Sequence, residues 1–166
     1  MQSEFESRDG HVMKLKSLET FIVGNPPPGF GGRYFIFVRL QTACGITGVG
    51  EIYAAAFGPT IVCDMAKDVF ERYLVDQSPS HIERFWHRAH GSGFTHRPDS
   101  VMQAVISGLE TACWDIAGKA FDQPIYELLG GKVHERLRSY TYLYPTLDQN
   151  PCSFYNDAYA SAEAAA

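Results

Sequence analysis

The sequence lacks the features that would mark a membrane protein, a secreted protein or a nucleic-acid-binding protein. No run approaches the roughly 18 consecutive apolar residues of a spanning helix, and residues 1–12 lack the apolar core of a signal peptide. Lys and Arg are scattered, and the net charge is -5 at pH 7, so the chain has no basic footprint for nucleic acid. These absences predict a cytoplasmic protein.

Cysteine pairs of the kind that bind zinc or exchange disulfides are also missing. No two cysteines form a C-x-x-C motif. Four cysteines could pair into two disulfides, but a chain with 45% hydrophobic residues does not need disulfides to build a core. We therefore expect reduced thiols at Cys44, Cys63, Cys113 and Cys152.

The first third of the chain contains strand patterns. Residues 18–23 and 34–42 are rich in β-branched and aromatic side chains, and 46–53 (ITGVGEIY) follows the turn ACG. Three antiparallel strands are predicted. Gly48 and Gly50 interrupt the last of them, which indicates a bulge or the close approach of another backbone.

After the strands, the spacing of apolar residues becomes that of helices, and a new strand, LRSYTYLYP, follows them. Strands followed by helices predict an α+β domain, a three-stranded antiparallel sheet with a helical bundle, that leads into something else. Gly91 is expected to stop the second helix. The expected helices cover 61–73, 78–91 with Ser78 as its cap and Pro79 in its first turn, 101–120, and a short turn between Pro124 and Gly130.

Glycine runs and histidines are the first candidates for a ligand site. PPPGFGGR and GITGVGE both lead into strands, whereas a phosphate loop opens a helix. His87 and His90 lie three apart on one expected helix, with His81 and His96 nearby, a spacing that could share a metal. No Cys, Asp or second His pair completes a tetrahedral set, so a solvated helix surface is the preferred interpretation.

Two acids lie in the segment VISGLETACWDIAGK, residues 105–119. Glu110 and Asp115 are five apart and point about 140° from each other on a helix, so they cannot share one proton or one ion. Asp115 can pair with Lys119, and Glu110 lies one turn from Trp114. We favour a structural role for both acids.

Several longer motifs carry a resemblance to a known family. AVISGLETACWDIAGK followed by PIYELLGG, together with GITGVGE, HIERFW and LRSYTYLYP in this order, resembles the N-terminal part of the mandelate racemase and muconate lactonizing enzyme group of the enolase superfamily. The resemblance implies a capping domain over 13–134 and the first strand and start of the first helix of a truncated β/α barrel over 135–166. Residues 1–12 would be a flexible extension.

The resemblance also implies a Mg²⁺-dependent enzyme that removes the proton α to a carboxylate. Family members hold the metal and the general base at the ends of later barrel strands. No catalytic residue and no metal ligand is therefore expected within this chain, and we expect the 166 residues alone to bind no Mg²⁺ and to turn over no substrate.

In the family, two loops of the cap cover the barrel mouth and help to choose the substrate. Here they would be 25–33 and 53–59. Arg33 could instead be a solvated loop residue and the aromatic residues simply core, and only the residues of one parity along the barrel strand face inward. The substrate-binding residues implied by the resemblance are Phe30, Arg33, Tyr53, Phe57, Tyr142 and Tyr144.

The polar side chains of Arg33, Tyr53 and Tyr144 suit a hydroxyl-rich acid. The preferred interpretation is therefore an acid-sugar dehydratase that acts on a small sugar acid. A homo-oligomer is expected from the family. A racemase or cycloisomerase of the same group is the first alternative. A non-catalytic truncated fragment or a stand-alone α+β interaction domain are the others, and whether the gene continues past Ala166 discriminates among them.

Overall fold

The computed structural model describes residues 13–27, 32–54, 57–91, 99–140, 148 and 150. The chain divides into two units, one made of Met1–Gly24 and Tyr34–Gly131 and the other of Asn25–Arg33 and Lys132–Ala166. The helices and strands of the described residues all belong to the first unit. The fold below is that of the first unit.

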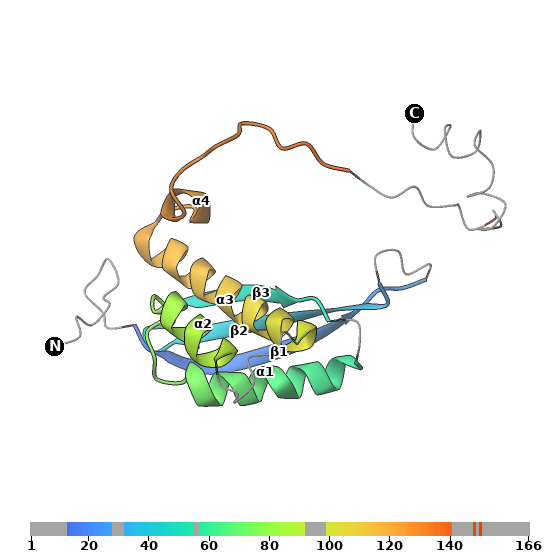
Figure 1. Ribbon diagram of the computed structural model, residues 1–166, viewed down its shortest axis with the longest axis horizontal. Helices are drawn as coiled ribbons and strands as arrows, with labels where there is room; N and C mark the ends of the chain where they lie inside the picture. The colour runs from blue at the N-terminus through green and yellow to red at the C-terminus, as the bar shows by residue number, and fades with distance from the viewer. Residues whose placement is uncertain are drawn as a thin grey trace. The chain divides into compact units, whose positions relative to one another are not determined.

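The core element is a three-stranded antiparallel sheet in the order β1 (Leu15–Gly24), β2 (Tyr34–Thr42), β3 (Thr47–Ile52) (Figure 1). β2 and β3 are joined by a tight turn in which the Thr42 amide donates to the carbonyl of Ile46 at 2.9 Å. The three predicted strands are confirmed. β1 and β3 form the two edges of the sheet.

Four helices follow the sheet: α1 (Pro59–Tyr73), α2 (Ile82–His90), α3 (Ser100–Phe121) and α4 (Ile125–Leu128). The Asp99 carboxylate caps α3, because its Oδ1 accepts from the amides of Val101 at 2.8 Å and Met102 at 3.1 Å. Gly91 ends α2 as predicted. The three-stranded sheet with helices confirms the α+β fold class.

The predicted start of the second helix was wrong. α2 begins at Ile82, and Ser78 lies in a turn that precedes it, in which the His81 amide donates to the Ser78 carbonyl at 3.2 Å. The Ser78 hydroxyl is within 2.9 Å of the Ser80 hydroxyl and accepts from the Ser80 amide at 3.4 Å. A hydroxyl that closes its own local turn is not available to cap a helix.

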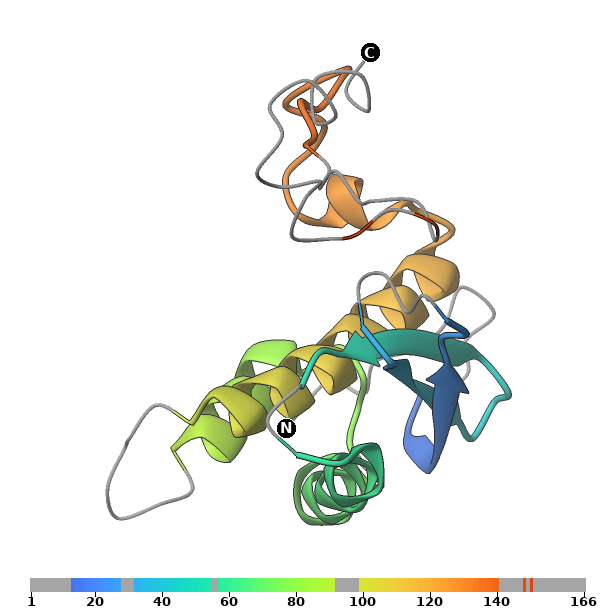
Figure 2. The same cartoon turned by 90° about the vertical axis from the view of Figure 1, so that its right-hand side faces the viewer.

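α3 packs directly on β3, and two glycines make this possible (Figures 1 and 2). A Cβ added at Gly50 would lie 1.9 Å from the carbonyl oxygen of Gly108, and one at Gly48 would lie 2.1 Å from that of Ala112. The predicted close backbone approach is thus confirmed. Because Gly50 meets the earlier helix residue and Gly48 the later one, α3 runs antiparallel to β3.

The hydrophobic core lies between the sheet and the helices. Buried side chains of β2 meet α3, which is buried on several sides, as its nearly uniform apolar character predicted. No helix among the described residues is both long and apolar enough to span a bilayer. The core residues of these two elements include Ile36, Val38, Leu40, Val105, Ile106, Leu109, Ala112 and Ile116.

Some predicted segments fall partly or wholly outside the described residues. The N-terminal extension, residues 1–12, lies outside them, as does the expected start of a barrel helix at 161–166. Of the expected barrel strand 137–145, residues 137–140 carry neither helix nor strand, and 141–145 lie outside.

Candidate functional site

The first loop expected at a substrate site, Asn25–Arg33, is closed at its base by Asn25. The Asn25 amide donates to the carbonyl of Arg33 at 2.9 Å, and its Nδ2 donates to the carbonyl of Gly32 at 2.7 Å. Gly32 has a φ of 142°, a conformation that residues with a Cβ rarely adopt. The described residue Arg33 is exposed, so its side chain can meet a ligand; Phe30 lies outside the described residues.

The second loop joins β3 to α1 and presents two aromatic side chains to solvent. Tyr53 is 76% exposed and Phe57 is 51% exposed. The hydroxyl of Tyr34, the first residue of β2, donates to the carbonyl of Phe57 at 2.8 Å. Gly58 caps α1 in an extended conformation. The loop is therefore held to the sheet next to one of its exposed aromatic residues.

The described residues bring together only part of the predicted site. Tyr53 and Phe57 lie on the same loop of the first unit, whereas Arg33 belongs to the second unit. Tyr142 and Tyr144 lie outside the described residues. The aromatic residues of the second loop are surface residues, which removes the alternative that they are simply core.

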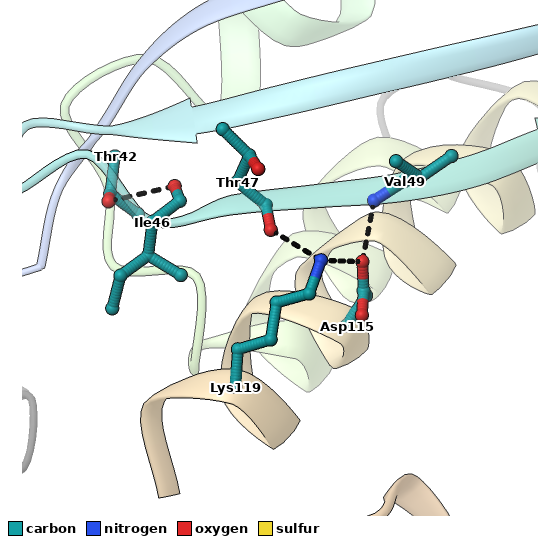
Figure 3. A network of polar contacts seen from close by, with 6 residues as sticks. All are labelled: Thr42, Ile46, Thr47, Val49, Asp115 and Lys119. Atoms are coloured by element: carbon teal, nitrogen blue, oxygen red, sulfur yellow. Dashed lines mark hydrogen bonds and ion pairs between the residues drawn. The ribbon is translucent and has the colours of Figure 1, made fainter. Parts of the chain in front are cut away.

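Asp115 and Lys119 bind the backbone of the edge strand β3, as Figure 3 shows. Asp115 Oδ2 accepts from the Val49 amide at 2.9 Å and from Lys119 Nζ at 2.7 Å. Lys119 Nζ also donates to the carbonyl of Thr47 at 2.8 Å. The predicted Asp115–Lys119 pair is confirmed, and its role is to fasten α3 to the sheet.

Glu110 and Cys113 show no arrangement suited to catalysis. Glu110 Oε1 accepts from the indole Nε1 of Trp114 at 3.4 Å, one turn along α3 as predicted. Burial, with a smaller contribution from the charge of Glu110, raises the pKa of the Cys113 thiol to about 12. Such a thiol stays protonated at neutral pH and is a poor nucleophile.

The histidines of α2 make contacts with neighbouring side chains. The His90 ring stacks on Trp86 with centroids 4.6 Å apart, and its Nδ1 is 2.6 Å from Nε2 of Gln103. His87 Nε2 lies 3.9 Å from a carboxylate oxygen of Glu83. Across the ranges that the structure describes, which omit His96, no three His, Cys, Asp or Glu side chains are grouped as metal ligands.

A groove of about 660 Å³ lies between the start of α2 and the last turns of α3. It is lined mainly by apolar side chains, including Trp114, Phe121 and Leu128. Because α3 runs antiparallel to β3, its last turns lie at the end of the sheet opposite to Tyr53. The groove and the second loop are thus separate features.

Comparison with known proteins gives the family. The model of the mandelate racemase/muconate lactonizing enzyme N-terminal domain matches residues 30–130. This chain belongs to that family. Within the enolase superfamily, the matched N-terminal domain is the capping domain, so the α+β unit described above is the cap.

Solved structures of family members share this fold. A protein from Labrenzia alexandrii DFL-11 assigned to the mandelate racemase/muconate lactonizing enzyme group is 63% identical, with a TM-score of 0.84, over 92% of this chain and 40% of its own. A mandelate racemase/muconate lactonizing enzyme from Jannaschia sp. CCS1 is 48% identical, with a TM-score of 0.85, over 92% of this chain and 39% of its own.

Curated relatives in the family include enzymes named D-galactonate dehydratase. The one from Verminephrobacter eiseniae is 36% identical over 77% of this chain, and the one from Ralstonia pickettii is 33% identical over 79% of this chain. The chain spans 31% of the length of each. The family match therefore concerns the N-terminal third of such enzymes.

Tyr34 is the residue at this site that the sequence did not point to. It falls within 34–42, a segment whose β-branched and aromatic residues predict only a strand. Its partner Phe57 is 23 positions away, and no short-range pattern relates a tyrosine at the start of a strand to a carbonyl in a later loop.

Proposed function

We propose that this chain is the N-terminal capping part of a Mg²⁺-dependent acid-sugar dehydratase, and that its two loops, 25–33 and 53–59, help to choose the substrate. The observation that carries the proposal is the match to several D-galactonate dehydratases over more than three quarters of this chain. The proposed domains are the cap over 13–134 and the start of a barrel over 135–166. The division between the two units after Gly131 supports this boundary.

The proposed reaction removes the proton α to a carboxylate and expels the β-hydroxyl as water, which leaves a 2-keto acid. Proton removal places additional negative charge on the substrate carboxylate, and a bound Mg²⁺ supplies the stabilisation of that charge. The described residues of this chain do not fit a Mg²⁺ site, since no three of their acids and histidines are grouped. The metal and the general base belong, in this proposal, to the larger part of the relatives' length that this chain does not span.

The contribution proposed for this chain is recognition of the substrate's hydroxyl groups and of its carboxylate. Tyr53 and Phe57 are exposed on one loop, where a ring and a phenolic hydroxyl can contact a polyol chain. Arg33 is exposed and can pair with a carboxylate. In the same proposal Phe30, Tyr142 and Tyr144 complete the substrate contacts, and a homo-oligomer is the expected assembly.

A racemase or cycloisomerase is the second candidate. The solved structures from Labrenzia alexandrii DFL-11 and Jannaschia sp. CCS1, 63% and 48% identical to this chain, carry the family designation of mandelate racemase/muconate lactonizing enzyme and name no dehydratase. A cap can serve either reaction, because the groups that decide the stereochemical outcome belong to the barrel.

The test is an assay of the product of the complete reading frame that encodes this chain. Purified enzyme with Mg²⁺ is incubated with a panel of sugar acids that includes D-galactonate, and 2-keto acid formation is measured. Dehydration of at least one member supports the proposal. Epimerisation of a hydroxy or amino acid in deuterated water, without dehydration of any sugar acid, would favour the second candidate.

A further inference from the structure

We infer that Tyr34 is a positioning residue for the loop between β3 and α1. Its hydroxyl holds the backbone at Phe57, and this fixes the side chain that the proposed function assigns to substrate contact. The inference rests on that proposed function for its consequence in catalysis. The contact itself is a feature of the fold and can be tested without activity.

The Tyr34 ring is held against the core by contacts that do not involve its hydroxyl. Tyr34 is the first residue of β2 and lies on the same face of the sheet as Ile36, because side chains alternate along a strand. Ile36 and its cross-strand partner Ile52 are both buried, and Tyr34 is half-buried against the same core. A ring held in this way has little freedom left to lose when its hydroxyl donates.

The Tyr34 hydroxyl contacts the loop at the residue that precedes the N-cap of α1. It donates to the carbonyl of Phe57 at 2.8 Å, a normal length for a hydroxyl donor. The next residue, Gly58, is the N-cap of α1, and its carbonyl accepts from the Val62 amide at 3.4 Å. The bond from Tyr34 therefore fixes the backbone immediately before the helix, while the Phe57 side chain remains 51% exposed.

A role in core packing alone would require only the Tyr34 ring. Phenylalanine would fill the same space, so a strand residue selected for packing has no need of a hydroxyl. Placing the hydroxyl on a loop carbonyl instead makes the position of an exposed aromatic residue depend on the rigid sheet. Sites supported by regular elements hold their geometry better than sites supported by loops.

The variant Tyr34→Phe removes the hydroxyl and keeps the ring. Tyr73→Phe is the matched control, because Tyr73 lies in the last turn of α1, roughly 20 Å along the helix from Phe57. Both variants are made in the product of the complete reading frame. Each retains the buried ring surface, so both are expected to fold.

Hydrogen exchange followed by mass spectrometry measures the contact directly. In Tyr34→Phe, the amides at the start of α1, beginning with that of Val62, which donates to the Gly58 carbonyl, are expected to exchange roughly fivefold faster, the effect of losing one neutral hydrogen bond from a local opening equilibrium. Tyr73→Phe should leave them unchanged. Equal exchange in the wild type and in Tyr34→Phe would overturn the inference.

Steady-state kinetics with a sugar acid that the wild type dehydrates measure the effect of Tyr34→Phe on catalysis. Tyr34→Phe is expected to raise KM several-fold with kcat nearly unchanged, because the loop contacts the substrate rather than the reacting atoms. If exchange increases and KM does not, the positioning role in catalysis is refuted although the contact stands. If the wild type turns over no sugar acid, the proposed function fails, and the exchange result still decides whether Tyr34 holds the loop.

Discussion

The carboxylate of Asp115 accepts a hydrogen bond from the backbone amide of Val49 at 2.9 Å, so an acid of α3 occupies an outward-facing donor of the edge strand β3. Lys119 does the same for the carbonyl of Thr47. Open backbone groups at a sheet edge invite pairing with another chain, and a helix that covers them removes this hazard. The two acids of α3 thus serve the fold: one fastens β3, and the other, Glu110, accepts from Trp114.

Replacing Asp115 by alanine is expected to lower the free energy of unfolding by about 1.5 kcal/mol, because Val49 loses its acceptor and Lys119 loses one of its two acceptors. Urea denaturation followed by tryptophan fluorescence measures the change. The matched control is Asp68→Ala, which removes an i,i+4 ion pair with Arg72 on the surface of α1. That change should stay within about 0.5 kcal/mol, and equal losses in the two variants would contradict the role given to Asp115.

Replacing Gly50 by alanine is expected to cost about 3 kcal/mol or more, because the new Cβ would lie 1.9 Å from a backbone oxygen of α3 that cannot move alone. Gly24→Ala is the control, since a Cβ there meets nothing within 4 Å. Urea midpoints compare the two variants. A Gly50→Ala protein as stable as Gly24→Ala would show that α3 does not pack on β3 as described.

The Cys113 thiol is expected to resist alkylation in the folded protein. Its pKa is raised to about 12, so at about pH 8 the reactive thiolate is scarce, and the fraction of thiolate grows only as the pH approaches that value. Cys44 is exposed and should react first. Peptide mapping after brief treatment with iodoacetamide reads both sites, and labelling of Cys113 as fast as Cys44 would be inconsistent with its burial.

Most of the fold could be predicted from local sequence patterns. The β-branched and aromatic content of 34–42 and the helical spacing in 101–120 predicted the corresponding elements nearly to the residue, because both signals lie in neighbouring positions of the sequence. The start of α2 was wrong because a serine can close its own turn as readily as it caps a helix, and the hydroxyl of Ser78 does the former. Three of the four cysteines are described, and they are free thiols as expected.

The candidate site could be predicted only as a pair of loops. Their positions follow from the order of strands, but the contacts that shape them join distant residues. Val49 and Asp115 are 66 positions apart, and Tyr34 and Phe57 are 23 apart, so no periodicity reveals either pair. The substrate contacts proposed for Arg33, Tyr53 and Phe57 rest on exposure and family resemblance and remain predictions.

The function proposed above makes this cap part of an enzyme that dehydrates a sugar acid. The most direct measurement incubates the product of the complete reading frame with D-galactonate and Mg²⁺, and follows by mass spectrometry the loss of one water and the appearance of a 2-keto acid. We expect dehydration of D-galactonate or of a related sugar acid, and we expect a chelator of divalent cations to abolish it. The proposed function would be contradicted if every sugar acid were recovered unchanged while the same enzyme epimerised another α-substituted acid.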